Sequence, residues 1–142
     1  MGTESHIDKA FSACDAVGGD LNRLSVPAKT IVIVTSAQGI IDHGGLEYFF
    51  ESDFPENPPY SEFSSAYRLI GAAQAADCID KAAETSPFPH PETRQELRRE
   101  FLEALPDGSE LNRLSNKICG DAEVWERLAA YGSVHFSEIC IA

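Results

Sequence analysis

The side chains best suited to catalysis or metal binding are dispersed through this sequence. No pair of cysteines has C-x-x-C spacing, and no histidines have H-x-x-x-H spacing. His43 beside Asp42, directly before a Gly-Gly step, is the most suggestive local pair for acid–base chemistry. A histidine near a helix C-terminus also has a structural role, because a cationic imidazole interacts favourably with the helix dipole. We therefore expect a protein that is not an enzyme and that has no cofactor and no metal site.

Carboxylates are the more informative charged groups. The segment between Lys29 and Arg68 contains no lysine or arginine, yet its acids carry half of the net charge of −12. A surface of this charge repels nucleic acids and anionic membranes and attracts basic proteins. We expect a basic protein as the partner, with no direct nucleic-acid or membrane binding; the alternative is that the acids only maintain solubility. The candidate partner-binding residues are Asp42, Glu47, Glu51, Asp53, Glu56 and Glu62.

Two further acidic rows have helical spacing. They are Asp77, Asp80 and Glu84, and then Glu92, Glu96, Glu100 and Glu103. Four residues of helix rise about 6 Å, which is comparable to the spacing of phosphates along a DNA strand. Lys81 is positioned to pair with Asp77 and Arg99 with Glu96, so we interpret these rows as ordinary solvated helix faces.

The size and composition of the chain predict one domain, residues 1–142, in which 43% of residues are hydrophobic. The sequence shows no signal-peptide pattern and no apolar run of 18 residues. The spacing of the cysteines favours free thiols, and Cys14 and Cys78 lie in apolar-periodic stretches where we expect them to be buried. These features together predict a cytoplasmic location.

Apolar periodicity and turn residues predict an all-α fold, a compact bundle of about 6–8 helices. The run from Thr30 to Thr35 is β-branched and also fits a strand, so periodicity alone leaves a helix and a buried strand open there. In the predicted helix over 91–105, the inward stripe is Leu97, Phe101, Leu102 and Leu105. The tail, 132–142, is either a short extended segment with a strand at 134–141 or a docked coil. The predicted helices span residues 5–17, 25–41, 46–51, 61–70, 72–84, 91–105, 110–119 and 121–131.

One sequence motif joins the glycine step to an aromatic cluster. It reads Gly44-Gly45-Leu46-Glu47-Tyr48-Phe49-Phe50. The three rings could form a binding surface or fill the core after a tight turn. We expect at least two of them in the core, because large apolar side chains are mostly buried.

The order of these motifs resembles the bacterial DNA-mimic protein family, in its C-terminal-domain family of mostly uncharacterised proteins. An apolar helix ends at Asp42-His43-Gly44-Gly45, and an aromatic-rich turn and a proline-containing loop follow. A helix pair then meets at Ile70-Gly71-Ala72, and the likeness covers about residues 24–131. His43 stands where this family commonly has Asn. The resemblance implies an all-α domain, often dimeric and without catalytic residues, whose acidic surface occupies the DNA-binding face of a transcription regulator. It also favours a helix at Thr30–Thr35.

Two functional hypotheses follow. The first is a non-enzymatic acidic protein that binds a basic protein, such as a DNA-binding regulator, by mimicking the charge of DNA. The alternative is a shape-specific interaction or immunity-type module whose acidity is incidental.

Overall fold

Helices account for the regular structure of this chain, and the predicted all-α class is confirmed. The computed structural model describes residues 5–54 and 56–142, and within these ranges it contains no strand. Short 3-10 turns lie at Leu21–Arg23, Pro91–Thr93 and Phe136–Glu138. The α-helices are α1 His6–Ala16, α2 Val26–Glu51, α3 Tyr60–Leu69, α4 Ala73–Glu84, α5 Gln95–Glu103, α6 Glu110–Ile118 and α7 Ala122–Val134. In the described ranges, every helix is too short or too polar to cross a bilayer.

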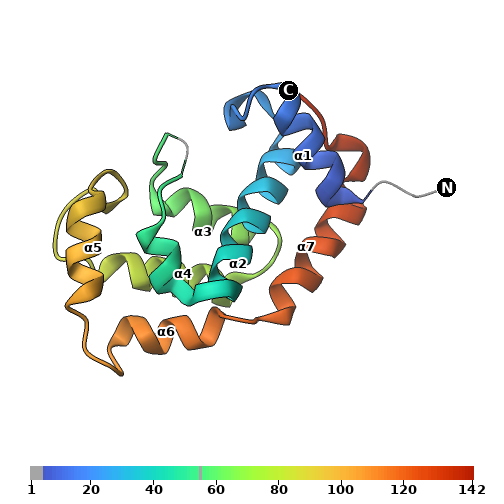
Figure 1. Cartoon of the computed structure of the whole chain (residues 1–142). Coiled ribbons are helices and arrows are strands. Elements are labelled where there is room, and N and C mark those ends of the chain that lie inside the picture. Colours follow the sequence, from blue (N-terminus) through green and yellow to red (C-terminus); the bar gives the residue numbers. More distant parts are fainter. Residues whose placement is uncertain (1–4, 55) are drawn as a thin grey trace.

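α2 is the central element, with α1, α3, α5, α6 and α7 packed against it (Figure 1). It begins at Ser25, whose hydroxyl accepts a hydrogen bond from the Ala28 N–H at 3.2 Å. The β-branched residues from Thr30 to Val34 are all buried in this helix. Their low helix propensity is outweighed by burial against neighbours on several sides. The prediction of a helix over a strand is therefore confirmed.

The direction of α2 changes at Gly45, where the backbone has φ 76° and ψ −177° (Figure 1). A side chain at Gly45 would collide with the Ser115 hydroxyl of α6. That hydroxyl accepts a 2.8 Å hydrogen bond from the Leu46 N–H, which the kink turns away from the helix. The predicted stop at the glycines is thus a kink, and the predicted short segment 46–51 continues the same helix.

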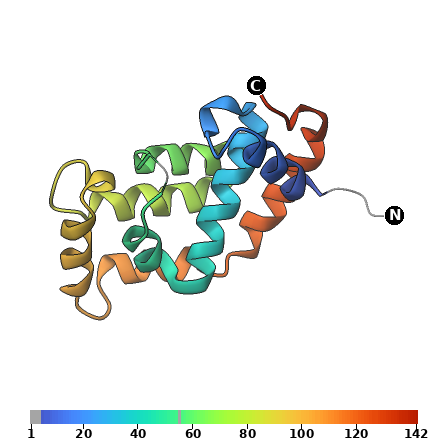
Figure 2. The same ribbon diagram turned by 45° about the horizontal axis from the view of Figure 1, so that its top comes forward.

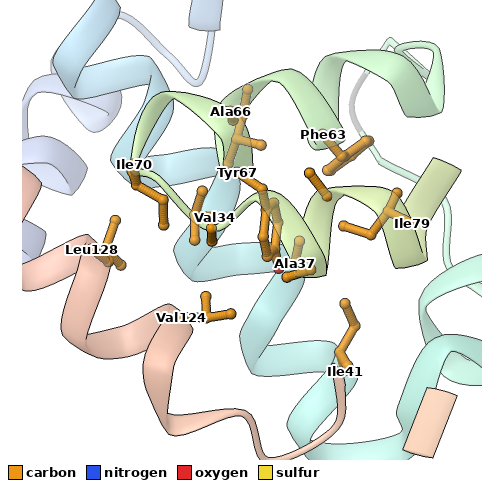
Figure 3. Close-up of a cluster of buried hydrophobic side chains, with 14 of the residues drawn as sticks. Val34, Ala37, Ile41, Phe63, Ala66, Tyr67, Ile70, Ile79, Val124 and Leu128 are labelled. Atoms are coloured by element: carbon orange, nitrogen blue, oxygen red, sulfur yellow. The ribbon is translucent and has the colours of Figure 1, made fainter. Parts of the chain in front are cut away.

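The core lies where α2, α3, α4 and α7 meet (Figure 3). From α2, Val34, Ala37 and Ile41 face inward, and all three are fully buried. α3 and α4 pair closely across Gly71, which has a positive φ of 86°. The other core side chains labelled in Figure 3 are Phe63, Ala66, Tyr67, Ile70, Ile79, Val124 and Leu128.

The aromatic motif divides between core and surface. Phe49 and Phe50 are buried, whereas Tyr48 is 43% exposed. The ring of Phe49 lies 5.1 Å from that of Phe63, and the ring of Phe50 lies 4.7 Å from that of Tyr60, both edge to face. The prediction that at least two of the three rings are in the core is confirmed.

The C-terminal tail docks beside the start of α2. Neither alternative describes all of 132–142: α7 continues to Val134, a 3-10 turn covers Phe136–Glu138, and the following residues dock as a coil. The only β-type contact of this tail within the described ranges is a single antiparallel bridge between Ile141 and Leu24, so the strand alternative at 134–141 is wrong. Ile139 anchors the tail in the core with 1% exposure. The Ser25 N–H donates to the Cys140 carbonyl at 2.9 Å. α1 and this tail lie at one end of the molecule and α5 lies at the other (Figure 2).

The predicted helix over 91–105 is shorter in the structure, where α5 covers only Gln95–Glu103. A 3-10 turn at Pro91–Thr93 follows His90, which has a left-handed φ of 51°, and α5 begins at Gln95. The predicted inward stripe was wrong at one position. Leu97 is 39% exposed, and the neighbouring Arg98 is buried in its place.

Candidate partner-binding surface

The acids of segment 30–67 occupy three different environments. Asp42 lies at a junction of α2 with the α6–α7 turn and accepts three hydrogen bonds from neutral donors. They come from the Gln38 amide at 2.8 Å, the Gly120 N–H at 2.7 Å and the Trp125 indole at 2.8 Å. The half-buried carboxylate of Asp42 therefore serves to hold these elements together.

Gln38 extends this network into the core. Its amide N–H also donates to the Ile118 carbonyl at 2.9 Å, and its oxygen accepts from the Tyr67 hydroxyl at 2.8 Å. Both residues are fully buried. Burial, with a further contribution from the negative charge of Asp42, raises the pKa of Tyr67, so its hydroxyl remains a donor. The polar chain from Tyr67 to Trp125 thus joins α3, α2 and α7.

Glu47 and Glu51 follow the kink and lie one helical turn apart, about 6 Å along the axis. Glu47 is half-buried and accepts a short hydrogen bond from the Asn112 side chain of α6. Glu51 is exposed. Tyr48 lies between them in sequence, with its ring 5.9 Å from that of the exposed His43.

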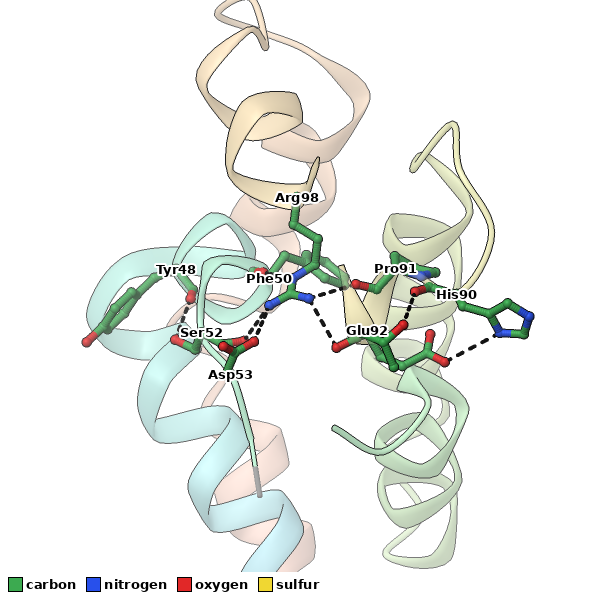
Figure 4. Close-up of polar contacts among 9 residues, drawn as sticks. Tyr48, Phe50, Ser52, Asp53, His90, Pro91, Glu92 and Arg98 are labelled. Carbon is green, nitrogen blue, oxygen red and sulfur yellow. Dashed lines mark hydrogen bonds and ion pairs between the residues drawn. The ribbon is translucent and has the colours of Figure 1, made fainter. Parts of the chain in front are cut away.

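Asp53 is exposed but paired with a base from a distant element (Figure 4). Its carboxylate lies 2.5 Å from the guanidinium of Arg98 on α5. The sequence alone suggests no base for Asp53, because the lysine and arginine nearest to it along the chain are Lys29 and Arg68. The fold neutralises it with an arginine more than 40 positions away.

Arg98 is the residue of this region that sequence reasoning missed. Its side chain is 3% exposed and donates to four backbone carbonyls as well as to Asp53 (Figure 4). The carbonyls are those of Phe50 at 2.7 Å, Pro91 at 2.7 Å, Glu92 at 3.1 Å and Ser52 at 3.5 Å. One sequence feature could have indicated that Arg98 is buried. It lies three residues before Phe101 and four before Leu102, and this spacing places it on the apolar face of α5.

Tyr60 packs beside this cluster. Burial raises the pKa of its hydroxyl to about 12, and the charge of Arg98 offsets part of that rise. The phenol is therefore neutral at physiological pH. The end of α2, the start of α3 and the 91–94 turn are thus held by one buried guanidinium and a cluster of rings.

Glu56 and Glu62 line an acidic recess at the other end of this loop. Both are exposed, and Glu56 and Asn57 have left-handed φ values of 65° and 44°. The recess lies between the 56–62 segment and the glycine turn after α1, and it has a volume of about 380 Å³. Asp20 and Lys29 also line it. Within residues 5–54 and 56–142, Glu51, Glu56 and Glu62 form no ion pair.

The acidic row on α4 has a different partner from the predicted one. Asp77 and Asp80 both pair with Arg68 of α3, at 2.9 and 2.6 Å, and not with Lys81. Because α3 packs against α4, Arg68 lies beside these two aspartates. The hydrogen bonds that Arg68 donates to Asp80 and Asp77 raise the pKa of its guanidinium, which keeps its charge at any physiological pH.

The described part of the chain holds no group of three or more residues arranged for a metal ion. All four cysteines are free thiols. Cys14 and Cys78 are only partly buried, and Cys119 and Cys140 are exposed. Burial is the main cause that raises the pKa of the Cys78 thiol, although Lys117 and Lys81 lie near it.

A known protein family has a model that matches this chain. A search of curated proteins and a search of solved structures found no significant similarity. The model of the family described as DMP19-like protein matches residues 22–135, close to the span over which the motifs resemble the DNA-mimic family. This span runs from the turn before α2 to the end of α7 and contains all six candidate acids. The chain therefore belongs to the DMP19-like family, the family of DNA mimic protein 19.

Proposed function

We propose that this protein is a non-enzymatic acidic protein that binds a basic protein, such as a DNA-binding transcription regulator, by presenting carboxylates in place of DNA phosphates. Membership of the DMP19-like family supports the proposal. The observation that carries it is the state of Glu51, Glu56 and Glu62. These acids are exposed and form no ion pair in the described ranges, on a chain of net charge −12.

Two of the three acids are held on helices. Glu51 ends α2, whose last carbonyls are fixed by Arg98, and Glu62 lies in the first turn of α3. Fixed charges cost less entropy on binding than charges on mobile segments. Association of this kind is fast and salt-sensitive, since complementary charges steer the partners together.

Asp42, Glu47 and Asp53 contribute differently in this proposal. Their carboxylates already accept hydrogen bonds within the chain, so they would add to the negative field while holding the surface in shape. The proposal includes a cytoplasmic location, where such a regulator resides.

The proposal also includes a homodimer, in which two copies would present two acidic surfaces. Sedimentation analysis tests this oligomeric state.

The test begins with affinity capture from native cytosol at about 50 and about 300 mM NaCl. The expected partner is a basic DNA-binding protein that is captured at low salt and released at high salt. The purified partner is then assayed for binding to its DNA with and without this protein. Competition between the protein and the DNA is the expected result.

Charge reversal then locates the surface. The triple variant E51K/E56K/E62K should bind the captured partner about 100-fold more weakly, since like charges across an interface cost several kcal/mol. The control E96K/E100K/E103K makes the same change in net charge on the exposed face of α5, and it should retain most of the affinity. Equal losses in both variants would contradict the assignment of the surface.

The shape-specific interaction or immunity-type module remains the alternative. One observation favours it: half of the candidate acids already have partners inside the fold. Salt titration of the purified complex separates the two hypotheses. Affinity that falls steeply with salt supports charge mimicry, and affinity that is flat with salt supports recognition by shape.

A further inference from the structure

A groove runs between the N-terminal half of α2 and α3, away from the kink at Gly45. Its volume is about 300 Å³. Thr30, Ile33 and Ala66 line it and are buried, with exposures of 3%, 7% and 4%. The exposed area of the lining is mainly apolar, although Lys29, Ser61, Glu62 and Ser65 also border the groove.

Two large apolar side chains on this groove face solvent. Val26, at the start of α2, is 63% exposed, and Leu69, at the end of α3, is 54% exposed. Neither side chain contributes much to the hydrophobic core. Covering apolar surface on binding favours the complex, because it removes that surface from water. Exposed apolar groups gathered around a groove are typical of an interaction site.

The groove adjoins the acidic recess. Lys29 and Glu62 line both hollows, and the recess adds Asp20 and Glu56. Asp20 also caps the following turn by accepting from the Asn22 N–H at 3.1 Å. The groove thus lies beside a site with three carboxylates and one ammonium group.

We infer that this groove receives a basic amphipathic segment of the partner protein. An apolar side chain of that segment would lie between Val26 and Leu69, and a lysine or arginine of the same segment would enter the recess beside Glu56 and Glu62. The inference rests on the proposed function, and it adds an apolar contact to recognition by charge. It fits a basic partner, because the recess beside the groove is lined by the carboxylates of Asp20, Glu56 and Glu62, which a lysine or arginine would neutralise.

The test uses two synthetic helical peptides of equal length and equal positive charge. One carries leucines on the face opposite its lysines and arginines, and the other carries serines there. The leucine peptide should bind the wild-type protein about 10-fold more tightly at about 0.15 M NaCl, because only it can cover the apolar groove. In NMR titrations, the amide shifts should change in residues 26–33 and 61–69.

Substitution of the groove residues gives the control. The double variant V26S/L69S keeps the charge and alters only exposed positions, so it should fold normally and bind both peptides equally. V134S, at a residue of α7 that is 76% exposed, should keep the preference for leucine. Circular dichroism verifies the fold of each variant.

The outcomes separate this inference from the proposed function. The inference about the groove is wrong if both peptides bind in a salt-sensitive way without a preference for leucine, or if the preference persists in V26S/L69S. Either result leaves recognition by charge intact. Binding that is insensitive to salt contradicts the proposed function itself. If V26S/L69S instead dissolves a dimer in sedimentation analysis and leaves the peptide preference unchanged, the groove is covered by a second copy and the inference is wrong.

Discussion

At the scale of single residues, one buried arginine organises the loop that carries the acids. Arg98 offers five N–H groups in a planar fork, and the carbonyls of Phe50 and Pro91 lie 2.7 Å from two of its nitrogens. Lysine has three donors on a single nitrogen and cannot reach carbonyls on both sides. A buried charge is costly unless it is paired and hydrogen-bonded, so this position tolerates little change.

We predict that Arg98→Lys lowers the free energy of unfolding by about 3 kcal/mol, because several buried carbonyls lose their donor. Urea denaturation followed by circular dichroism measures the change. The neighbouring Arg99 is exposed and has no ion pair in the described ranges, so Arg99→Lys should change stability by less than about 0.5 kcal/mol. Similar effects of the two substitutions would show that the hydrogen bonds of the Arg98 guanidinium do not stabilise the fold.

At the scale of the element, the kink in α2 decides where the aromatic motif points. Gly45 has a φ that L-residues rarely adopt, and Ser115 closes the gap by accepting from the Leu46 N–H. The segment after the kink then directs Phe49 and Phe50 into the core and leaves Tyr48 and Glu51 facing solvent. The kink therefore sets both the packing of the rings and the exposure of the acid.

Two alanine substitutions in the same helix test this. Gly45→Ala should lower the free energy of unfolding by about 2–3 kcal/mol, since it strains the backbone and collides with Ser115. Gly39 has an open environment inside the regular part of α2, so Gly39→Ala should raise stability by about 0.5–1 kcal/mol. Both changes are measured by chemical denaturation, and a tolerated Gly45→Ala would contradict the role of the kink.

At the scale of the whole molecule, the net charge of −12 affects the stability of the isolated protein. A surface with a large excess of one sign repels itself, and folding brings these charges closer together. Ion pairs such as those of Arg68 with Asp77 and Asp80 relieve the repulsion only locally. A basic partner would relieve it over the contact area, so binding and stability are coupled.

We predict that Tm rises by about 2–5 °C between about 10 and about 300 mM NaCl, because salt screens the repulsion between carboxylates. Each Glu→Lys change removes one negative charge and adds one positive charge, so E51K/E56K/E62K has a net charge of −6 and should show a smaller rise. Differential scanning calorimetry at several salt concentrations measures both. A fall in Tm with salt would show that attractive pairs outweigh repulsion.

Local patterns in the sequence determined the helical class, most helix positions and the family resemblance. Periodic apolar residues and glycine or proline punctuation act over a few residues, so they can be interpreted without the fold. The same patterns failed where a long-range contact decides the outcome. Leu97 was expected in the core, but the carbonyls that bind Arg98 come from residues that the sequence alone does not bring near α5.

Only the tertiary structure separated the six acids of segment 30–67 into paired and unpaired groups. Asn112, Trp125 and Arg98 lie 45 to 83 positions away from the carboxylates that they bind. The charge of a segment is fixed by composition, whereas the field that a partner meets depends on which carboxylates the folded chain neutralises. The sequence thus determined how much negative charge this protein carries, and the packing of α5, α6 and α7 around α2 decided which part of it remains unpaired at the surface.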